Sequence, residues 1–317
     1  MTRESRVTAD ASRSTPTAAP YAVLAIGVLV VSTASILIRF AQAEGVSSLA
    51  IAATRLGLAA IVLLPFALVR ARSEIAGLAP RDLALTAGSG ALLAIHFWSW
   101  ITSLEYTSVA SSTVLVTTNP LWVGVASVVL LREKLHLAAV AGLALSVAGM
   151  LLTFAADTTA ALPSPNAPLG NTLALVGAVS ASGYLLIGRA VRKRMSLIAY
   201  VALAYAAAAV LLCVAALLSG APLRGHSGAG WLFLVLLAVG PQLIGHTTFN
   251  WSLRHLSATF VALAILGEPI GSAILAWLML GETFSTAQLT GFALLLAGIF
   301  LAGRGEARTQ EAPSRSS

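Results

Sequence analysis

The 317-residue chain is 58% hydrophobic and only 10% charged, and its formal net charge is +7 at pH 7. Soluble domains contain roughly 25% charged and about 45–50% apolar residues, so this composition excludes a soluble globular protein and predicts a membrane protein. The apolar stretches are continuous rather than alternating, which excludes porin-like strands and favours membrane-spanning helices. The single cysteine, Cys213, excludes an intrachain disulfide.

Ten apolar runs follow one another along the chain, each long enough for a spanning helix of about 20 residues. They lie at about 21–40, 47–69, 83–104, 107–131, 136–155, 169–189, 197–218, 230–252, 258–280 and 287–303. A polar, Ser- and Thr-rich stretch at 1–20 is predicted to be a disordered tail, and a second tail covers 304–317. Ala41-Gln42-Ala43 resembles a signal-peptidase site, but the internal repeat described below requires the run before it.

The basic residues predict the orientation of these helices. Of the 19 Lys and Arg, 16 lie in the two tails or in connections that would all share one side of the membrane. The opposite side receives only Arg224, while Arg39 and Arg55 lie within runs. By the positive-inside rule, both termini are predicted to be cytoplasmic. The net positive charge therefore reflects orientation, and no nucleic-acid partner is expected.

The second half of the chain repeats the first at an offset of 149 residues (268 minus 119). Asn119-Pro120 lies over Glu268-Pro269, LREKL at 131–135 lies over LGETF at 280–284, and Gly142, Ala148 and Gly149 lie over Gly291, Ala297 and Gly298. We therefore predict two five-helix halves, at 21–155 and 169–303, joined by an extracytoplasmic connection at 156–168. Because five is odd, the second half crosses the membrane in the opposite sense, a design typical of secondary transporters.

Two stretches carry this match, NPLWVGVASVVLLREKLHLAAVAGLALSVAGMLL in the first half and GEPIGSAILAWLMLGETFSTAQLTGFALLLAGIFL in the second. They resemble the EamA-type repeats of the drug/metabolite transporter superfamily, and Arg55 in ATRLGLAA matches an arginine often found in the second helix of such repeats. The resemblance implies an all-α, polytopic protein with ten transmembrane helices in a bacterial inner (plasma) membrane. It also implies transport of a small metabolite, often outward (efflux), by alternating access. It specifies no substrate, and we expect no cofactor and no metal site.

Polar side chains inside the predicted spans are the candidate substrate site. Gln242, His246 and Asn250 are spaced i, i+4 and i+8 and therefore share one face of a helix, and His96 lies on a comparable polar stripe. The candidate substrate-binding residues are His96, Trp98, Asn119, Tyr184, Gln242, His246, Asn250 and Glu268. Histidine titrates near neutral pH and a buried glutamate can hold a proton, so His96, His246 and Glu268 are also candidates for proton coupling.

The pair Glu268-Pro269 allows two interpretations. Proline removes a backbone donor and bends a helix, so Glu268 either lines a polar cavity beside the bend or only braces it. Pro120 occupies the matching place after Asn119, which cannot ionise.

Three further charged residues are predicted to have structural roles. We expect Arg55 to snorkel to the membrane surface, with pairing to an acid or to an anionic substrate as the alternative. Glu133 and Glu282 occupy matching positions beside helix ends, and we expect them to fix loops or helix termini rather than to contact substrate.

The small residues of the fifth and tenth runs predict close helix packing, either with each other or across a homodimer. The expected partners are a small-molecule substrate and membrane lipid. An uptake carrier of the same fold, a channel and an intramembrane enzyme are the alternatives to an exporter. The sequence contains no HExxH or GxSxG motif and no dense His/Cys cluster, which argues against an enzyme, and no GxxxxGK[ST] loop, which argues against an ATP-driven pump.

Overall fold

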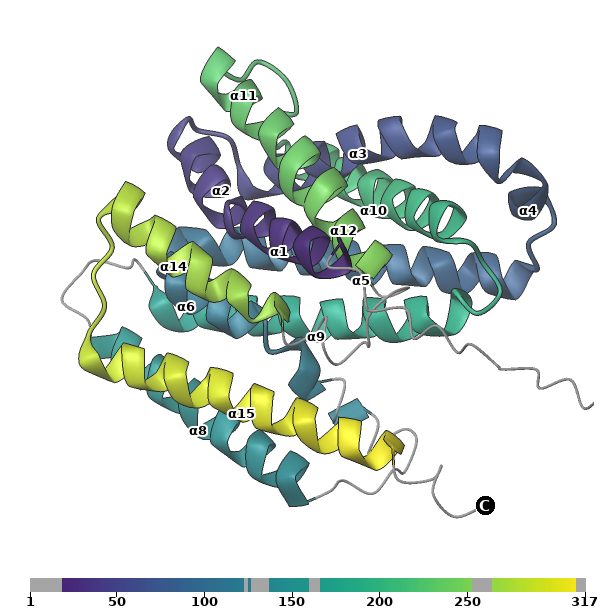
Figure 1. Cartoon of the computed structure of the whole chain (residues 1–317). Coiled ribbons are helices and arrows are strands. Elements are labelled where there is room, and N and C mark those ends of the chain that lie inside the picture. Colours follow the sequence, from purple (N-terminus) through teal and green to yellow (C-terminus); the bar gives the residue numbers. More distant parts are fainter. Residues whose placement is uncertain (1–18, 123–124, 127–136, 160–165, 253–263, 312–317) are drawn as a thin grey trace, which may run out of the picture.

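The computed structural model describes residues 19–122, 125–126, 137–159, 166–252 and 264–311, and every regular element within these residues is a helix (Figure 1). The first half contains α1 (Ala19–Ser32), α2 (Ala34–Ala43), α3 (Ser48–Arg70), α4 (Arg72–Ala76), α5 (Pro80–Tyr106), α6 (Val109–Val116) and α8 (Leu137–Thr159). The second half contains α9 (Ala167–Val191), α10 (Leu197–Ser219), α11 (Gly228–Leu237), the π-helix η1 (Ala238–His246), α12 (Thr247–Ser252), α14 (Gly267–Leu280) and α15 (Thr286–Glu311). The prediction of an all-α polytopic membrane protein is confirmed.

Helices long and apolar enough to cross a membrane make up most of the described chain. Six such stretches are Ala19–Ala43, Ser48–Arg70, Pro80–Tyr106, Ala167–Gly188, Leu197–Ser219 and Gly228–Phe249. Three shorter apolar helices are Val140–Ala156, Gly267–Leu280 and Thr286–Leu301. Each of the ten apolar runs contains one of these helices, except that the fourth run is represented by α6.

Small polar residues and glycines set the ends of these helices. The N-cap side chains that accept a hydrogen bond from the first turn are Ser47, Ser108, Asn166, Ser196 and Ser227. Such caps satisfy backbone donors that have no partner within the helix. At the other end, α10 and α14 stop at glycines with positive φ, 71° at Gly220 and 68° at Gly281, a conformation that a side chain would strain.

The helices pack in pairs that relate one half of the chain to the other. Three pairs join matching helices of the two halves: α8 packs along α15, α3 along α10, and α6 against α14 (Figure 1). Two further pairs join the third helix of one half to the first helix of the other. The third helix of the first half, α5, packs along α9, and η1, in the third helix of the second half, packs against α1. This pattern has the approximate two-fold symmetry that two inverted five-helix repeats require.

Glycines bring α8 and α15 into backbone contact. A β-carbon added at Gly149 would lie 2.5 Å from the backbone nitrogen of Leu295, and one added at Gly298 would lie 2.6 Å from the carbonyl oxygen of Gly142. Only glycine permits such an approach, and small residues of this kind drive helix packing in lipid. The small-residue faces of the fifth and tenth runs therefore pack against each other within one chain, while a homodimer stays a prediction.

Candidate functional site

Arg55 lies at the centre of a polar and aromatic cluster between the two halves. It is 0% exposed, and its Nε donates a 2.8 Å hydrogen bond to Oε1 of Gln242. Its guanidinium carbon lies 4.3 Å from the centroid of the Phe97 ring and 6.0 Å from that of Trp100. Arg55 comes from α3, Gln242 from η1 and the two rings from α5, so the cluster joins three helices. The expectation that Arg55 snorkels is wrong, because its side chain is fully buried.

The two predicted histidines lie against the same phenylalanine. The ring of His96 is 4.7 Å from that of Phe97, and the ring of His246 is 5.8 Å from it. His96 also stacks on Trp100 at 6.0 Å, and its Nδ1 lies 2.9 Å from the carbonyl oxygen of Gly177 on α9. Because a carbonyl can only accept, Nδ1 carries the hydrogen in this contact. The structure therefore brings His96, His246 and Gln242 together around Arg55 and Phe97.

Gln242 and His246 are carried by a π-helix rather than by an α-helix. The π-helical stretch spans Ala238–His246 and contains Pro241, which has no backbone N–H to donate. π-Helical segments inside longer helices are rare and occur frequently at functional sites. Asn250, the third member of the predicted polar stripe, lies on α12, and its side chain is outside the described part of the structure.

Glu268 is buried at the first turn of α14, with 8% of its surface exposed. It lies within electrostatic range of Arg55, whose charge also acts on His96 and His246. Among the described residues, no ion pair joins Arg55 to a carboxylate. Glu268 is therefore an electrostatic neighbour of the cluster and not a bonded partner of Arg55.

The same hydrogen bond occurs beside both prolines. The hydroxyl of Ser32, on α1, donates to the carbonyl of Glu268 at 3.3 Å, and the hydroxyl of Ser182, on α9, donates to the carbonyl of Asn119 at 3.1 Å. The first helix of each half thus binds the residue that precedes the proline in the fourth helix of the other half. The hydroxyl of Ser272, on α14, donates a 3.0 Å bond to the carbonyl of Ser32 on α1. Pro120 and Pro269 therefore have equivalent surroundings, which supports the interpretation that the residues before them brace a helix bend.

The side chain of Asn119 donates hydrogen bonds to two backbone carbonyls. With its amide nitrogen oriented toward the neighbouring carbonyls, it donates to Val116 at 2.9 Å and to Ala178 at 3.0 Å. Asn119 thus ties the end of α6 to α9. Its amide is occupied by backbone carbonyls, which supports a bracing role in the first half rather than the predicted contact with substrate.

Two aromatic candidates lie apart from Arg55. Trp98 is 45% exposed, whereas Trp100 is the tryptophan of α5 that packs beside Arg55, so substrate binding by Trp98 stays a prediction. Tyr184 is buried on α9, and its ring lies 6.0 Å from that of Tyr200. The hydroxyl of Tyr200 is 2.6 Å from that of Ser89, so Tyr184 belongs to a separate contact between α5, α9 and α10.

Glu282 fixes a helix end, as its sequence position predicts. Its two carboxylate oxygens accept from the backbone nitrogen of Val109, at 2.9 and 3.1 Å, at the start of α6. A carboxylate is favourable there because helix N-termini carry unpaired donors and partial positive charge. The contact joins the fourth helix of one half to the end of the fourth helix of the other. Glu133, at the matching position, lies outside the described residues.

Sequence reasoning missed Phe97 and Tyr205. Phe97 is the ring that Arg55, His96 and His246 share, and Tyr205 on α10 is 1% exposed and lies beside Arg55 and Gln242. Neither residue differs from its apolar neighbours in a way that marks a site. Trp100 could have been found, because it lies one helical turn after His96 on the same face.

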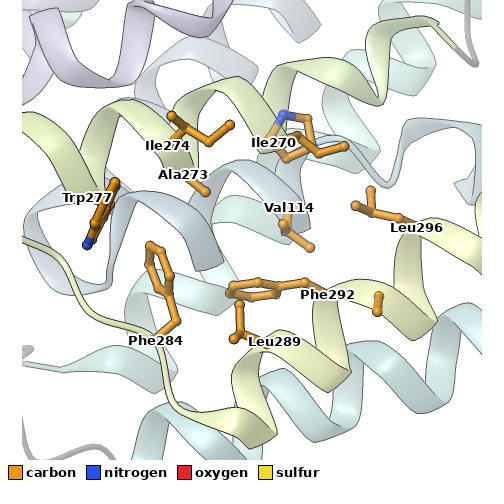
Figure 2. Close-up of a pocket in the computed structure, with 11 residues that line it drawn as sticks. Val114, Ile270, Ala273, Ile274, Trp277, Phe284, Leu289, Phe292 and Leu296 are labelled. Atoms are coloured by element: carbon orange, nitrogen blue, oxygen red, sulfur yellow. The ribbon is translucent and has the colours of Figure 1, made fainter.

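A separate pocket of about 520 Å³ lies between α14, α15 and α6 (Figure 2). Its lining residues are Val114, Pro269, Ile270, Ala273, Ile274, Trp277, Phe284, Leu289, Phe292, Ala293 and Leu296. Figure 2 shows the rings of Trp277, Phe284 and Phe292 along its walls. The lining offers almost no hydrogen-bonding group, so this pocket lacks the polar groups that orient a polar metabolite.

The paired helices and the polar cluster between the halves define a polytopic membrane protein built from two repeats. Residues 19–155 and 168–304 each match the EamA-like transporter family, and the chain belongs to this family. An uncharacterized transporter of Archaeoglobus fulgidus is 24% identical over 208 residues, which cover 65% of this chain and 71% of that protein. An uncharacterized transporter of Clostridium kluyveri is 24% identical over 245 residues, which cover 75% of this chain and 78% of that protein. A solved crystal structure shares the fold, with a TM-score of 0.63 and 22% identity, over 93% of this chain and 99% of its own.

Proposed function

We propose that this protein is a secondary transporter that moves a small metabolite outward across the bacterial inner membrane by alternating access. The observation that carries the proposal is the buried hydrogen bond between Arg55 and Gln242, which joins the two halves of the chain. Carriers with inverted repeats bind their substrates at the interface between the repeats, near the middle of the membrane. Buried ionisable residues inside membrane spans are expensive and mark substrate or ion pathways, and this cluster contains several.

The paired architecture supports alternating access. Matching helices meet in α3–α10, α6–α14 and α8–α15, so each half contributes an equivalent surface to the interface. Rocking one half against the other about such an interface would open the cluster to each side of the membrane in turn.

Glu268 is our candidate for the group that carries a proton, with His96 and His246 as further candidates. Arg55 contributes one positive charge to the interior, and an ionised Glu268 would balance it without forming a direct ion pair. A second negative charge entering this region would favour protonation of Glu268, because unbalanced charge is costly in a medium of low dielectric constant. An anionic substrate and a proton would then bind and cross the membrane together, so the outward gradient of the substrate would drive export.

The orientation is part of the proposal. With both termini in the cytoplasm, a reporter fused after residue 317 and one inserted in the 156–168 connection should report opposite sides of the membrane. Reporters on the same side would contradict the inverted-repeat arrangement.

Transport itself is tested in inside-out membrane vesicles from cells that express the protein, compared with vesicles from cells that do not. Uptake of a panel of labelled metabolites is measured with and without a pH gradient. Accumulation that depends on the protein and on the gradient supports proton-coupled export. Uptake only into right-side-out vesicles would favour an import carrier, and rapid flux that never exceeds equilibrium would favour a channel.

A further inference from the structure

Arg55 leaves two of its guanidinium nitrogens, Nη1 and Nη2, without hydrogen-bond partners although it is 0% exposed. The indole Nε1 of Trp100 is also buried and unpartnered, and Nε2 of Gln242, although Tyr205 lies beside this amide, makes no hydrogen bond of normal geometry. All four atoms are donors, and none of them can accept a hydrogen bond. A buried donor without an acceptor is unfavourable, especially on a charged group. A hydrogen-bond acceptor placed among these donors would therefore be stabilised.

The side chains of Arg55, Gln242 and Trp100 lie close to one another. Oε1 of Gln242 accepts from Nε of Arg55 at 2.8 Å, so Nε2 of the same planar amide lies beside the guanidinium. The ring of Trp100 lies 6.0 Å from the guanidinium carbon. A ligand group placed against the two Nη atoms would therefore lie beside the amide of Gln242 and near the ring of Trp100.

The described residues supply no acceptor of opposite charge to this group. The titratable neighbours of Arg55 are Glu268 on α14, Tyr205 on α10, His96 on α5 and His246 on η1. Glu268 is the carboxylate among them, and it forms no ion pair with Arg55. A ligand from outside the chain is the partner that fits the cluster.

We infer that Arg55, Gln242 and Trp100 form a subsite that binds the carboxylate of the transported solute. The flat guanidinium fork matches the two oxygens of a carboxylate and can donate two parallel hydrogen bonds to them. A carboxylate fits better than a phosphate dianion, because Arg55 is the one buried Lys or Arg among the described residues. The rings of Phe97 and Trp100 provide an apolar wall for the rest of the solute. This inference rests on the proposed transport function and specifies small organic acids as its substrate class.

The test compares probes that differ mainly in charge: propionate, isobutyrate and phenylacetate against propionamide, isobutyramide and phenylacetamide. Their binding to the purified full-length protein is measured from the rise in melting temperature with ligand concentration, which gives Kd. We expect at least one acid to bind tenfold or more tightly than its own amide. Equal binding of every acid and its amide, or no binding of any acid, would overturn the inference.

Three variants test whether the preference for acids over amides arises from this subsite. Arg55→Lys keeps the charge but removes the fork, and Gln242→Glu places a carboxylate of the protein itself beside Arg55. We expect both to reduce the acid-over-amide ratio below threefold. Gln242→Glu should keep or raise the melting temperature, because the new carboxylate pairs with the buried arginine. A loss of acid binding by this variant then cannot be attributed to misfolding. Arg39→Lys is the matched control, since Arg39 already donates to the carbonyl of Leu104, and it should retain the tenfold ratio.

A tenfold ratio that survives both Arg55→Lys and Gln242→Glu would show that Arg55 is purely structural, and would overturn the inference. Transport is scored separately, in proteoliposomes against protein-free liposomes. Protein-dependent flux of the amides without any preference for acids would refute the subsite and leave the transport function standing. A purified protein with the tenfold preference that moves neither acids nor amides would instead refute the transport function and leave the subsite standing.

Discussion

Replacing Gly149 with alanine tests whether α8 and α15 are held together by backbone contact. The added β-carbon would lie 2.5 Å from the nitrogen of Leu295 and 2.6 Å from the carbonyl oxygen of Gly291. Ordinary contacts begin at 3.4 Å, so the two backbones must separate by about 0.9 Å (3.4 minus 2.5) at this point. Neither neighbour is a flexible side chain that could move aside alone, and the whole helix pair must therefore adjust.

Overpacking of this kind costs about 1–3 kcal/mol, and alanine recovers about 0.5–1 kcal/mol through its better helix propensity. We expect a net loss of about 1–2 kcal/mol for Gly149→Ala. Gly88→Ala is the matched control, because a β-carbon on this exposed glycine of α5 would meet no atom within 4 Å. The control should be neutral or slightly stabilised.

The assay is thermal unfolding of both purified variants in the same detergent. If the two variants differ by about 2 kcal/mol, the melting temperature of Gly149→Ala should lie about 4–8 °C below that of Gly88→Ala, at about 2–4 °C per kcal/mol. Equal melting temperatures would refute the reasoning, because they would mean that α8 and α15 do not approach each other as closely as the structure shows.

Three further predictions concern side chains. Glu268→Gln should remain folded but lose most transport and any dependence on a pH gradient, whereas a bracing role predicts near-normal transport for Glu268→Gln and reduced thermal stability for Glu268→Leu. Glu282→Ala should lower stability by about 1–2 kcal/mol in thermal unfolding, because the backbone nitrogen of Val109 loses its acceptor; an unchanged melting temperature would contradict this. Ser32→Ala and Ser182→Ala should each cost about 1 kcal/mol, and clearly unequal losses would argue against equivalent roles in the two halves.

Much of the fold could be predicted from the residues alone. Composition and run length predicted a helical membrane protein, because every backbone polar group in lipid must be paired within its own segment. The offset between Asn119-Pro120 and Glu268-Pro269 revealed two halves, and the structure shows equivalent serine bonds at both places. The position of Glu282 beside a helix end predicted a structural role, but its partner, the backbone nitrogen of Val109, is 173 residues away and could not be predicted.

Part of the candidate site could also be predicted. The intramembrane polar residues His96, Gln242 and His246 stood out because polar groups are costly in lipid, and the structure places all three around Arg55. The partner of Arg55 could not be predicted, since Gln242 is 187 residues away and belongs to the other half.

The orientation of aromatic and apolar residues was decided only by the tertiary structure. A helix of a soluble protein shows its buried face as an apolar stripe, but a helix in lipid is apolar all round because lipid tails are as apolar as the protein interior. Sequence therefore could not distinguish Trp98, which faces outward, from Trp100, which packs beside Arg55. For the same reason, the small residues of α8 and α15 indicated a close contact without indicating its partner. The sequence determined which segments span the membrane and which are repeated, and packing between distant segments decided which faces meet.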